Sequence, residues 1–357
     1  MSNFKAFLKK KDITVTWQRY GIEALGAMAQ GLFCSLLIGT IIKTLGTQLG
    51  VQFITDIGTY AMAVSGPAMA VAIGYALKSP PMVLFSLAAV GWAANAEGGA
   101  GGPLAVLIIA IAAAECGKAV SKETKVDLLV TPGVTILVGV ALAKLIAPPI
   151  GTAANALGLL IIEATNLRPF FMGILVSVIV GVALTLPISS AAICSVLGLT
   201  GLAGGAAVAG CCAQMVGFAV ISFRENGWSG IVSQGLGTSM LQMSNILKNP
   251  RIWIAPTLAS AVTGPLATCL FKLQMNGAPI NSGMGTCGMC GPIGVITGWF
   301  EPSEAALASG AAAITPGAFD WIGLALIAIV LPAVLSWLFN AVLRKLGWVH
   351  DGDMKLS

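Results

Sequence analysis

The chain has 357 residues, of which 57% are hydrophobic and only 9% are charged, and its mean hydropathy is +0.91. Soluble domains carry about 25% charged residues, so this composition excludes a soluble globular domain and predicts several membrane-spanning helices. The net charge of +5 does not indicate nucleic-acid binding, because the basic residues lie at the ends of apolar segments.

Both ends of the chain are basic. Residues 1–19 form an arm before the first apolar run, and residues 344–357 form a tail that begins with Arg344 and Lys345. The arm lacks the short apolar core and cleavage site of a signal peptide, so we expect it to be retained. Because basic residues concentrate on the cytoplasmic side of membranes, both termini are expected in the cytoplasm, with an even number of crossings between them.

A first transmembrane half is predicted over residues 20–149. Three of its apolar runs have about the 20 residues that a spanning helix needs: residues 20–42, 57–77 and 126–147. The third of these is expected to stop at Pro148-Pro149. Residues 82–116 are interrupted by a polar and glycine-rich stretch from Asn95 to Pro103. This leaves arms of about 13 residues, too short to cross, so a re-entrant hairpin or two tilted helices are expected.

Glu97 and Asn95 lie in this interruption and are candidate substrate-binding residues. A carboxylate at membrane depth costs about 2.5–3.5 kcal/mol on insertion scales, which makes an intramembrane Glu a functional candidate by default. The alternative is a solvated loop at the interface. The depth of Glu97 depends on whether the segment is re-entrant, so both readings remain open.

A second transmembrane half is predicted over residues 169–343, after a less apolar stretch, residues 150–168, that predicts an amphipathic connecting helix. Its predicted spans are residues 170–186, 191–220, 252–270 and 322–342, with a polar loop and tilted helix over residues 222–250. The whole pattern predicts an all-α polytopic membrane protein with about eight to ten transmembrane helices and two re-entrant hairpins.

Two matched interruptions lie in this second half. Pro187-Ile188-Ser189-Ser190 and Pro279-Ile280-Asn281-Ser282 share the pattern Pro-Ile-X-Ser within apolar sequence. Paired interruptions of this kind are typical of a transporter's substrate site, since unwound backbone and half-helix ends can face a polar ligand. Ser189, Ser190, Asn281 and Ser282 are therefore candidate substrate-binding residues. The alternative is a pair of proline kinks whose Ser and Asn satisfy the freed carbonyls.

No metal or cofactor is expected. Cys287-Gly288-Met289-Cys290 matches C-x-x-C, but a tetrahedral metal needs two further ligands and the only histidine is His350, in the tail. Two small residues in a tight glycine-rich hairpin explain this motif better. No catalytic residue is evident either, so any phosphorylation would need a separate partner protein, and enzymatic activity stays undecided.

At the two interruptions the chain resembles the membrane (IIC) components of bacterial sugar phosphotransferase systems, in particular the stand-alone IIC-like group that includes a perfringolysin regulator. The resemblance rests on TLPISSAAI at residues 185–193 and PINSGMGTCGMCGPIG at residues 279–294. Gly298-Trp299-Phe300-Glu301-Pro302 also keeps the Gly-x-x-Glu-Pro spacing of a sugar-contacting motif in glucose-type subunits. The resemblance therefore implies a substrate contact for Glu301.

The resemblance further implies a homodimer in a bacterial plasma membrane, with a scaffold half and a transport half that moves like an elevator. We expect a permease for a small polar substrate, most plausibly a sugar, working with separate IIA and IIB proteins. The alternative is a non-transporting membrane sensor that uses the same pocket. An ion channel is a weaker third reading, since no charged or carbonyl filter motif is evident.

Overall fold

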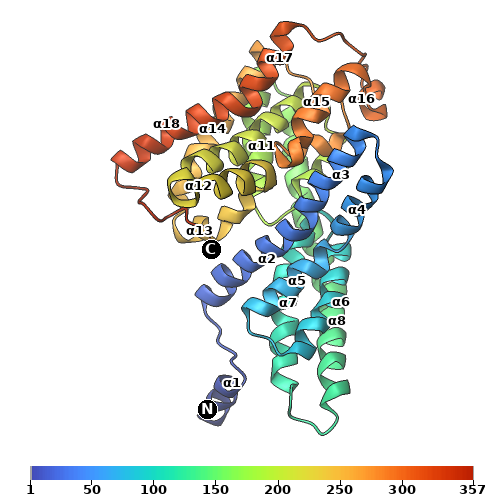
Figure 1. Ribbon diagram of the computed structural model, residues 1–357, viewed down its shortest axis with the longest axis vertical. Coiled ribbons are helices and arrows are strands. Elements are labelled where there is room, and N and C mark those ends of the chain that lie inside the picture. The colour runs from blue at the N-terminus through green and yellow to red at the C-terminus, as the bar shows by residue number, and fades with distance from the viewer. Residues whose placement is uncertain (1, 357) are drawn as a thin grey trace. The chain divides into compact units, whose positions relative to one another are not determined.

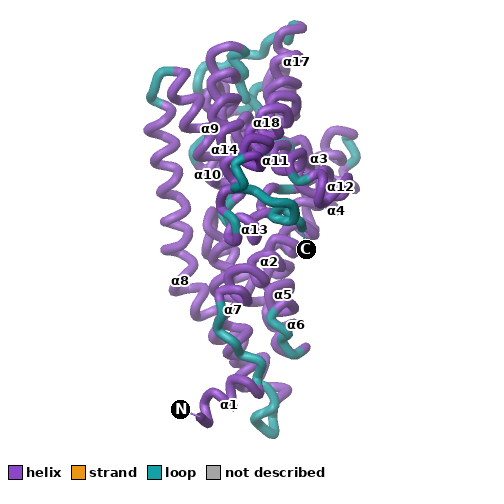
Figure 2. Tube along the Cα trace, turned by 90° about the vertical axis from the view of Figure 1, so that its left-hand side faces the viewer, coloured by secondary structure: helices purple, strands orange, loops and turns teal. Residues whose placement is uncertain are grey.

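The computed structural model describes the backbone of residues 2–356 and the side chains of residues 6–356. Within this part the secondary structure is helical, apart from one isolated β-bridge between Gly201 and Met275. Figure 2 shows the helices joined mostly by short loops. The predicted all-α fold is confirmed.

Among the described residues, six helices are long and apolar enough to cross a membrane, and a pair bent by 48°, Gln52–Ala63 with Ser65–Ala76, adds a seventh if it is one span. The six are Gln18–Leu49, Pro81–Val120, Asp127–Thr165, Gly201–Ile221, Pro250–Leu270 and Ala318–Lys345, of which Pro81–Val120 is a helical hairpin described below. Two shorter apolar helices, Pro169–Thr185 and Cys287–Phe300, accompany them. The chain is therefore a polytopic membrane protein, as predicted.

The chain divides into two compact units, Met1–Ala153 and Ala154–Ser357. The first begins with α1 (Ser2–Lys10), followed by a long helix that contains α2 (Ala24–Leu32) and α3 (Ile38–Leu49), and then by α4 (Gln52–Ala63) and α5 (Ser65–Ala76). Helix α3 packs on α4, and α2 packs on α5. These approaches are close because glycines line them: a methyl group at Gly46 would lie 2.4 Å from the Thr55 backbone nitrogen.

Residues 82–116 form a helical hairpin. The prediction that its two arms have only about 13 residues each is wrong. Helix α6 (Pro81–Gly98) has 18 residues and α7 (Gly102–Val120) has 19, so each is about 27–28 Å long at 1.5 Å per residue. The helix continues through Asn95 and Glu97, and the chain reverses at Gly99, whose φ of +49° suits glycine. In lipid, keeping these backbone groups in a helix satisfies them internally.

Helix α8 (Asp127–Thr165) does not end at Pro148-Pro149, where a stop was predicted. It runs for 39 residues, about 58 Å at 1.5 Å per residue, which is roughly twice the hydrocarbon thickness of a bilayer. The Thr152 hydroxyl donates to the Pro148 carbonyl at 3.1 Å. The boundary between the two units falls inside this helix, between Ala153 and Ala154.

The second unit is built around α11 (Gly201–Ile221), which packs against three other helices (Figure 1): α9 (Pro169–Thr185), α14 (Ile254–Pro265) and α18 (Leu331–Lys345). Small residues let the backbones meet, since a methyl group at Gly210 would lie 1.8 Å from the Ser177 carbonyl oxygen. Its shorter helices are α10 (Ser190–Val196), α12 (Phe223–Val232), α13 (Met243–Lys248), α15 (Cys290–Phe300), α16 (Glu304–Ala308) and α17 (Ala318–Ala325).

The N-terminal arm is held to the first unit by charge pairs. Glu123 accepts hydrogen bonds from Lys11 at 2.6 Å and Lys10 at 3.2 Å, and these hold the pKa of its carboxyl below the ordinary 4.5. A lowered pKa stabilises the docked arm above pH 4.5, and that contribution is lost as the pH falls through the lowered value. The arm is therefore docked by an acid-sensitive contact.

We expect the backbone amides of residues 6–11 to lose hydrogen-exchange protection as the pH is lowered below 4.5. The change should be modest, because exposed ion pairs contribute little. The substitution Glu123→Gln removes the charge, so that variant should show weaker protection at pH 7 and no further loss on acidification. Equal acid sensitivity in wild-type and variant would assign the effect to another group.

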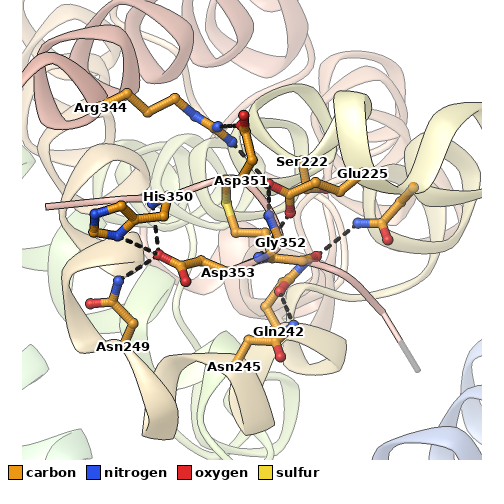
Figure 3. Close-up of polar contacts among 12 residues, drawn as sticks. Ser222, Glu225, Gln242, Asn245, Asn249, Arg344, His350, Asp351, Gly352 and Asp353 are labelled. Atoms are coloured by element: carbon orange, nitrogen blue, oxygen red, sulfur yellow. Dashed lines mark hydrogen bonds and ion pairs between the residues drawn. The ribbon is translucent and has the colours of Figure 1, made fainter. Parts of the chain in front are cut away.

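The C-terminal tail docks onto the polar segment that follows α11, as Figure 3 shows. The Glu225 carboxylate accepts hydrogen bonds from Arg344 Nη2 at 3.0 Å, from the Gly352 amide at 3.2 Å and from the Met354 amide at 2.8 Å. Met354 is fully buried. Further side chains of this segment bond the tail backbone: Asn226, Gln242, Asn245 and Asn249. The Glu225 carboxylate thus binds the Arg344 guanidinium and two backbone amides of the tail.

Replacing Glu225 with glutamine is expected to release the tail. Glutamine keeps the size but has one acceptor oxygen and no charge, so a loss of roughly 1.5–3 kcal/mol is expected from charge-assisted hydrogen bonds. Hydrogen exchange of residues 349–356 should rise in the variant. Glu163→Gln, at an exposed position on α8, is the matched control and should leave the exchange of the tail unchanged. An unchanged tail in Glu225→Gln would contradict this role.

Candidate functional site

The two Pro-Ile-X-Ser interruptions, predicted as a pair, lie against each other in the second unit. Helix α9 ends at Thr185 and α10 begins at Ser190, so residues 186–189 are unwound. The second interruption is a short 3-10 turn over Pro279–Gly283, which packs on α10. The Ser190 hydroxyl donates to the Gly283 carbonyl at 2.7 Å. Segments about ninety residues apart in sequence are thereby joined.

Three of the four candidate residues at the breaks (the break residues Ser189, Ser190, Asn281 and Ser282) use their side chains to bond the protein's own backbone. Ser189 caps α10, accepting from the Ala192 amide at 3.2 Å. Ser190 and Ser282 are buried, and Ser282 donates to the Pro279 carbonyl at 2.7 Å. These contacts satisfy groups that the breaks free, as the proline-kink alternative expects. Their hydroxyl oxygens keep acceptor capacity, but their first role is to hold the loops in place.

Asn281 differs from these serines. Its side chain is half-buried, and its carboxamide makes no hydrogen bond to another described residue. It lies against α15, where a methyl group at Gly294 would come within 2.9 Å of Asn281 Nδ2. A carboxamide offers two donors and an acceptor, so Asn281 presents both kinds of group to a ligand.

The chain after Asn281 turns tightly beside α11. Gly285, with φ of +53°, lies so close to α11 that a methyl group there would be 2.7 Å from Cys211 Cβ. Cys287 and Cys290 are buried and form no disulfide in the described part of the chain. The small side chains of this segment allow its backbone to lie close to α11.

Glu301 follows α15. Hydrogen bonds hold the backbone at this turn, whereas the Glu301 carboxylate is exposed. The Ser303 amide donates to the Asn276 carbonyl at 2.8 Å, and the Ser303 hydroxyl donates to the Gly277 carbonyl at 2.9 Å. The turn is thus tied to the segment just before the second break. The Glu301 side chain is exposed and makes no polar contact with the four break residues in the described part of the chain. A substrate contact for Glu301 stays a prediction.

Asn95 and Glu97 belong to the first unit, in the last turn of α6. Glu97 accepts from Lys144 Nζ at 2.5 Å, so its charge is paired within the unit. The Asn95 side chain lies beside Gly66 and Gly102, where a methyl group at Gly102 would be 2.5 Å from Asn95 Oδ1. Helix packing and an ion pair account for both residues, and their substrate role stays a prediction.

A buried polar network next to the first break was missed in the sequence. Gln214 is fully buried in the middle of α11, and its Oε1 accepts from Trp253 Nε1 at 3.0 Å and from the Thr185 hydroxyl at 3.4 Å. Thr185 also bonds the Ser239 hydroxyl at 2.8 Å. An amide within an apolar span was the available signal, because buried polar groups need partners. The network anchors the end of α9, where the break begins.

A family model described as "Phosphotransferase system, EIIC" matches residues 22–356. The chain belongs to this EIIC family. The family resemblance inferred from the two interruptions is confirmed, and so is the assignment to a multi-pass membrane component of a transport system. EIIC proteins act with IIA and IIB partners on a sugar. A comparison with curated protein sequences gives no match.

Proposed function

We propose that this EIIC protein is a permease that binds a sugar where the two Pro-Ile-X-Ser breaks meet and carries it across the membrane. The observation that carries the proposal is the contact between the breaks, made by the Ser190 hydroxyl on the Gly283 carbonyl. Paired broken segments supply fixed backbone dipoles and polar side chains at a substrate site. A separate IIB protein would then phosphorylate the sugar, because EIIC proteins act with IIA and IIB partners.

The break residues have two different proposed roles, substrate contact and support of the loops. A sugar hydroxyl both donates and accepts hydrogen bonds, and the uncommitted Asn281 carboxamide can do both in return. Ser190 and Ser282 hold the two loops together and so position Asn281. We propose Glu301 as a further contact at the edge of the site, and a homodimer with cytoplasmic termini as the working assembly.

Uptake by proteoliposomes tests the proposal. The purified protein is reconstituted, radiolabelled sugars are added outside, and phosphorylated IIB is supplied or withheld inside. Accumulation of one sugar as its phosphate, only with IIB, is the expected result. Binding of a sugar in a thermal-shift assay without uptake under either condition would replace the permease with the sensor. Neither binding nor uptake of any phosphotransferase sugar would overturn both readings.

A further inference from the structure

A groove of about 500 Å³ in the second unit is lined by residues of α18, of the end of α11 and of α12. Figure 1 shows these three helices. Two spanning helices, Gly201–Ile221 and Ala318–Lys345, both end beside it. Helix ends mark the level at which a chain leaves the hydrocarbon core. A groove beside the ends of two spanning helices is expected to lie near a membrane interface. It is lined chiefly by Val220, Phe223, Trp228, Ile231, Trp337 and Ala341, with three polar residues.

The apolar wall of the groove is rich in aromatic side chains. Trp228 is 76% exposed and Trp337 is 60% exposed, and Phe223 meets Trp228 edge-to-face with ring centroids 5.5 Å apart. Tryptophan gathers where a membrane protein meets the headgroup region, because its ring is amphipathic. Such a wall suits the upper part of an acyl chain.

The lining of the groove includes one cation without an ion pair, Arg224, and one buried amide oxygen without a hydrogen-bond partner, that of Asn340. Arg224 is exposed and makes no ion pair or hydrogen bond with another described residue, whereas Arg344 is already paired with Glu225 and Asp351. Asn340 is only 5% exposed, and its Oδ1 is buried with no hydrogen-bond partner. A buried amide oxygen without a partner is costly, so a ligand that donates a hydrogen bond fits here.

We propose that this groove is a binding site for one anionic phospholipid whose headgroup carries hydroxyls, as phosphatidylglycerol does. The phosphate pairs with Arg224, a headgroup hydroxyl donates to Asn340, and the start of one acyl chain lies along Trp337. The positive charge of Arg224 favours an anionic lipid. The unpaired amide oxygen of Asn340 favours a headgroup that can donate a hydrogen bond. The site is separate from the two Pro-Ile-X-Ser breaks and does not depend on the transported substrate.

Native mass spectrometry of the full-length protein in detergent tests the site. Phosphatidylglycerol and phosphatidylcholine with identical acyl chains are titrated separately. We expect one phosphatidylglycerol to bind more tightly than phosphatidylcholine. Arg224→Gln should weaken phosphatidylglycerol about fivefold, the effect of one basic residue at a membrane surface, and leave phosphatidylcholine unchanged. Arg168→Gln, also exposed, is the charge-matched control and should change neither.

A second variant tests the groove rather than the charge. Ala341→Trp fills the space next to Asn340 and should remove the tightly bound lipid while circular dichroism stays unchanged. Equal binding of both lipids by the wild-type protein, or no effect of Arg224→Gln, would overturn the proposal in favour of non-specific lipid contact. Competition by inorganic phosphate at millimolar concentration would overturn it in favour of a free-anion site.

Discussion

Replacing Asn281 with alanine is expected to weaken sugar binding by about 10- to 100-fold, because one or two sugar hydroxyls would be buried without a partner. Asn281 is the break residue whose side chain is not used by the protein's own backbone. The variant should keep its fold, since the carboxamide makes no internal hydrogen bond in the described part of the chain. Isothermal titration or thermal shift with the transported sugar measures the change.

Two further variants separate ligand contact from loop support. Asn155→Ala removes an exposed carboxamide from α8 and should leave affinity unchanged. Ser190→Ala removes the hydrogen bond that joins the breaks, so it should lower both thermal stability and affinity. If Asn281→Ala binds sugar with wild-type affinity while remaining folded, Asn281 is not a substrate contact.

The interruptions show how far sequence reasoning reached. The Pro-Ile-X-Ser pair was recognised because its prolines sit in apolar sequence, and the structure unwinds both positions. The same reasoning was wrong at Pro148-Pro149, where α8 continues. Proline removes one hydrogen bond wherever it occurs, but whether a helix breaks depends on what else can satisfy the freed carbonyls. Tertiary contacts therefore decide whether a proline in an apolar segment breaks the helix.

Long-range polar contacts were out of reach for a related reason. The sequence predicted a basic cytoplasmic tail but no contact for it, yet Glu225, more than a hundred residues earlier, accepts hydrogen bonds from its amides. Backbone amides carry no residue-specific signal in a sequence, so an acceptor for them cannot be recognised by pattern. Gln214 was recognisable as an amide in an apolar span, although its partners Thr185 and Trp253 were not. A buried charged or amide side chain needs hydrogen-bond partners, but the identity of those partners is known only from the fold.

A buried cation in the first unit, Lys118, also has partners that the sequence does not reveal. Its contacts have a large effect on stability, because a buried charge without a partner is costly. Lys118 is 2% exposed, at the end of α7. Its ammonium donates to the Asp12 carbonyl at 2.8 Å and the Leu77 carbonyl at 3.0 Å, and it pairs with Glu115 at 3.1 Å. Glu115 also accepts from the Tyr20 hydroxyl at 3.0 Å. One side chain therefore connects the N-terminal arm, the end of α5 and α7.

Replacing Lys118 with methionine is expected to destabilise the protein by about 3 kcal/mol or more, because it leaves the Glu115 carboxylate, only 13% exposed, without its cation. Methionine preserves most of the volume, so the loss is electrostatic rather than a packing defect. The double variant Lys118→Met/Glu115→Gln should recover part of the stability, since it removes the unpaired charge. Lys125→Met, at an exposed position, is the control and should stay close to wild-type. Unfolding in mixed micelles, followed by tryptophan fluorescence, measures all four proteins. If the double variant were no more stable than Lys118→Met, the stability would come from the carbonyls of Asp12 and Leu77 rather than from the ion pair.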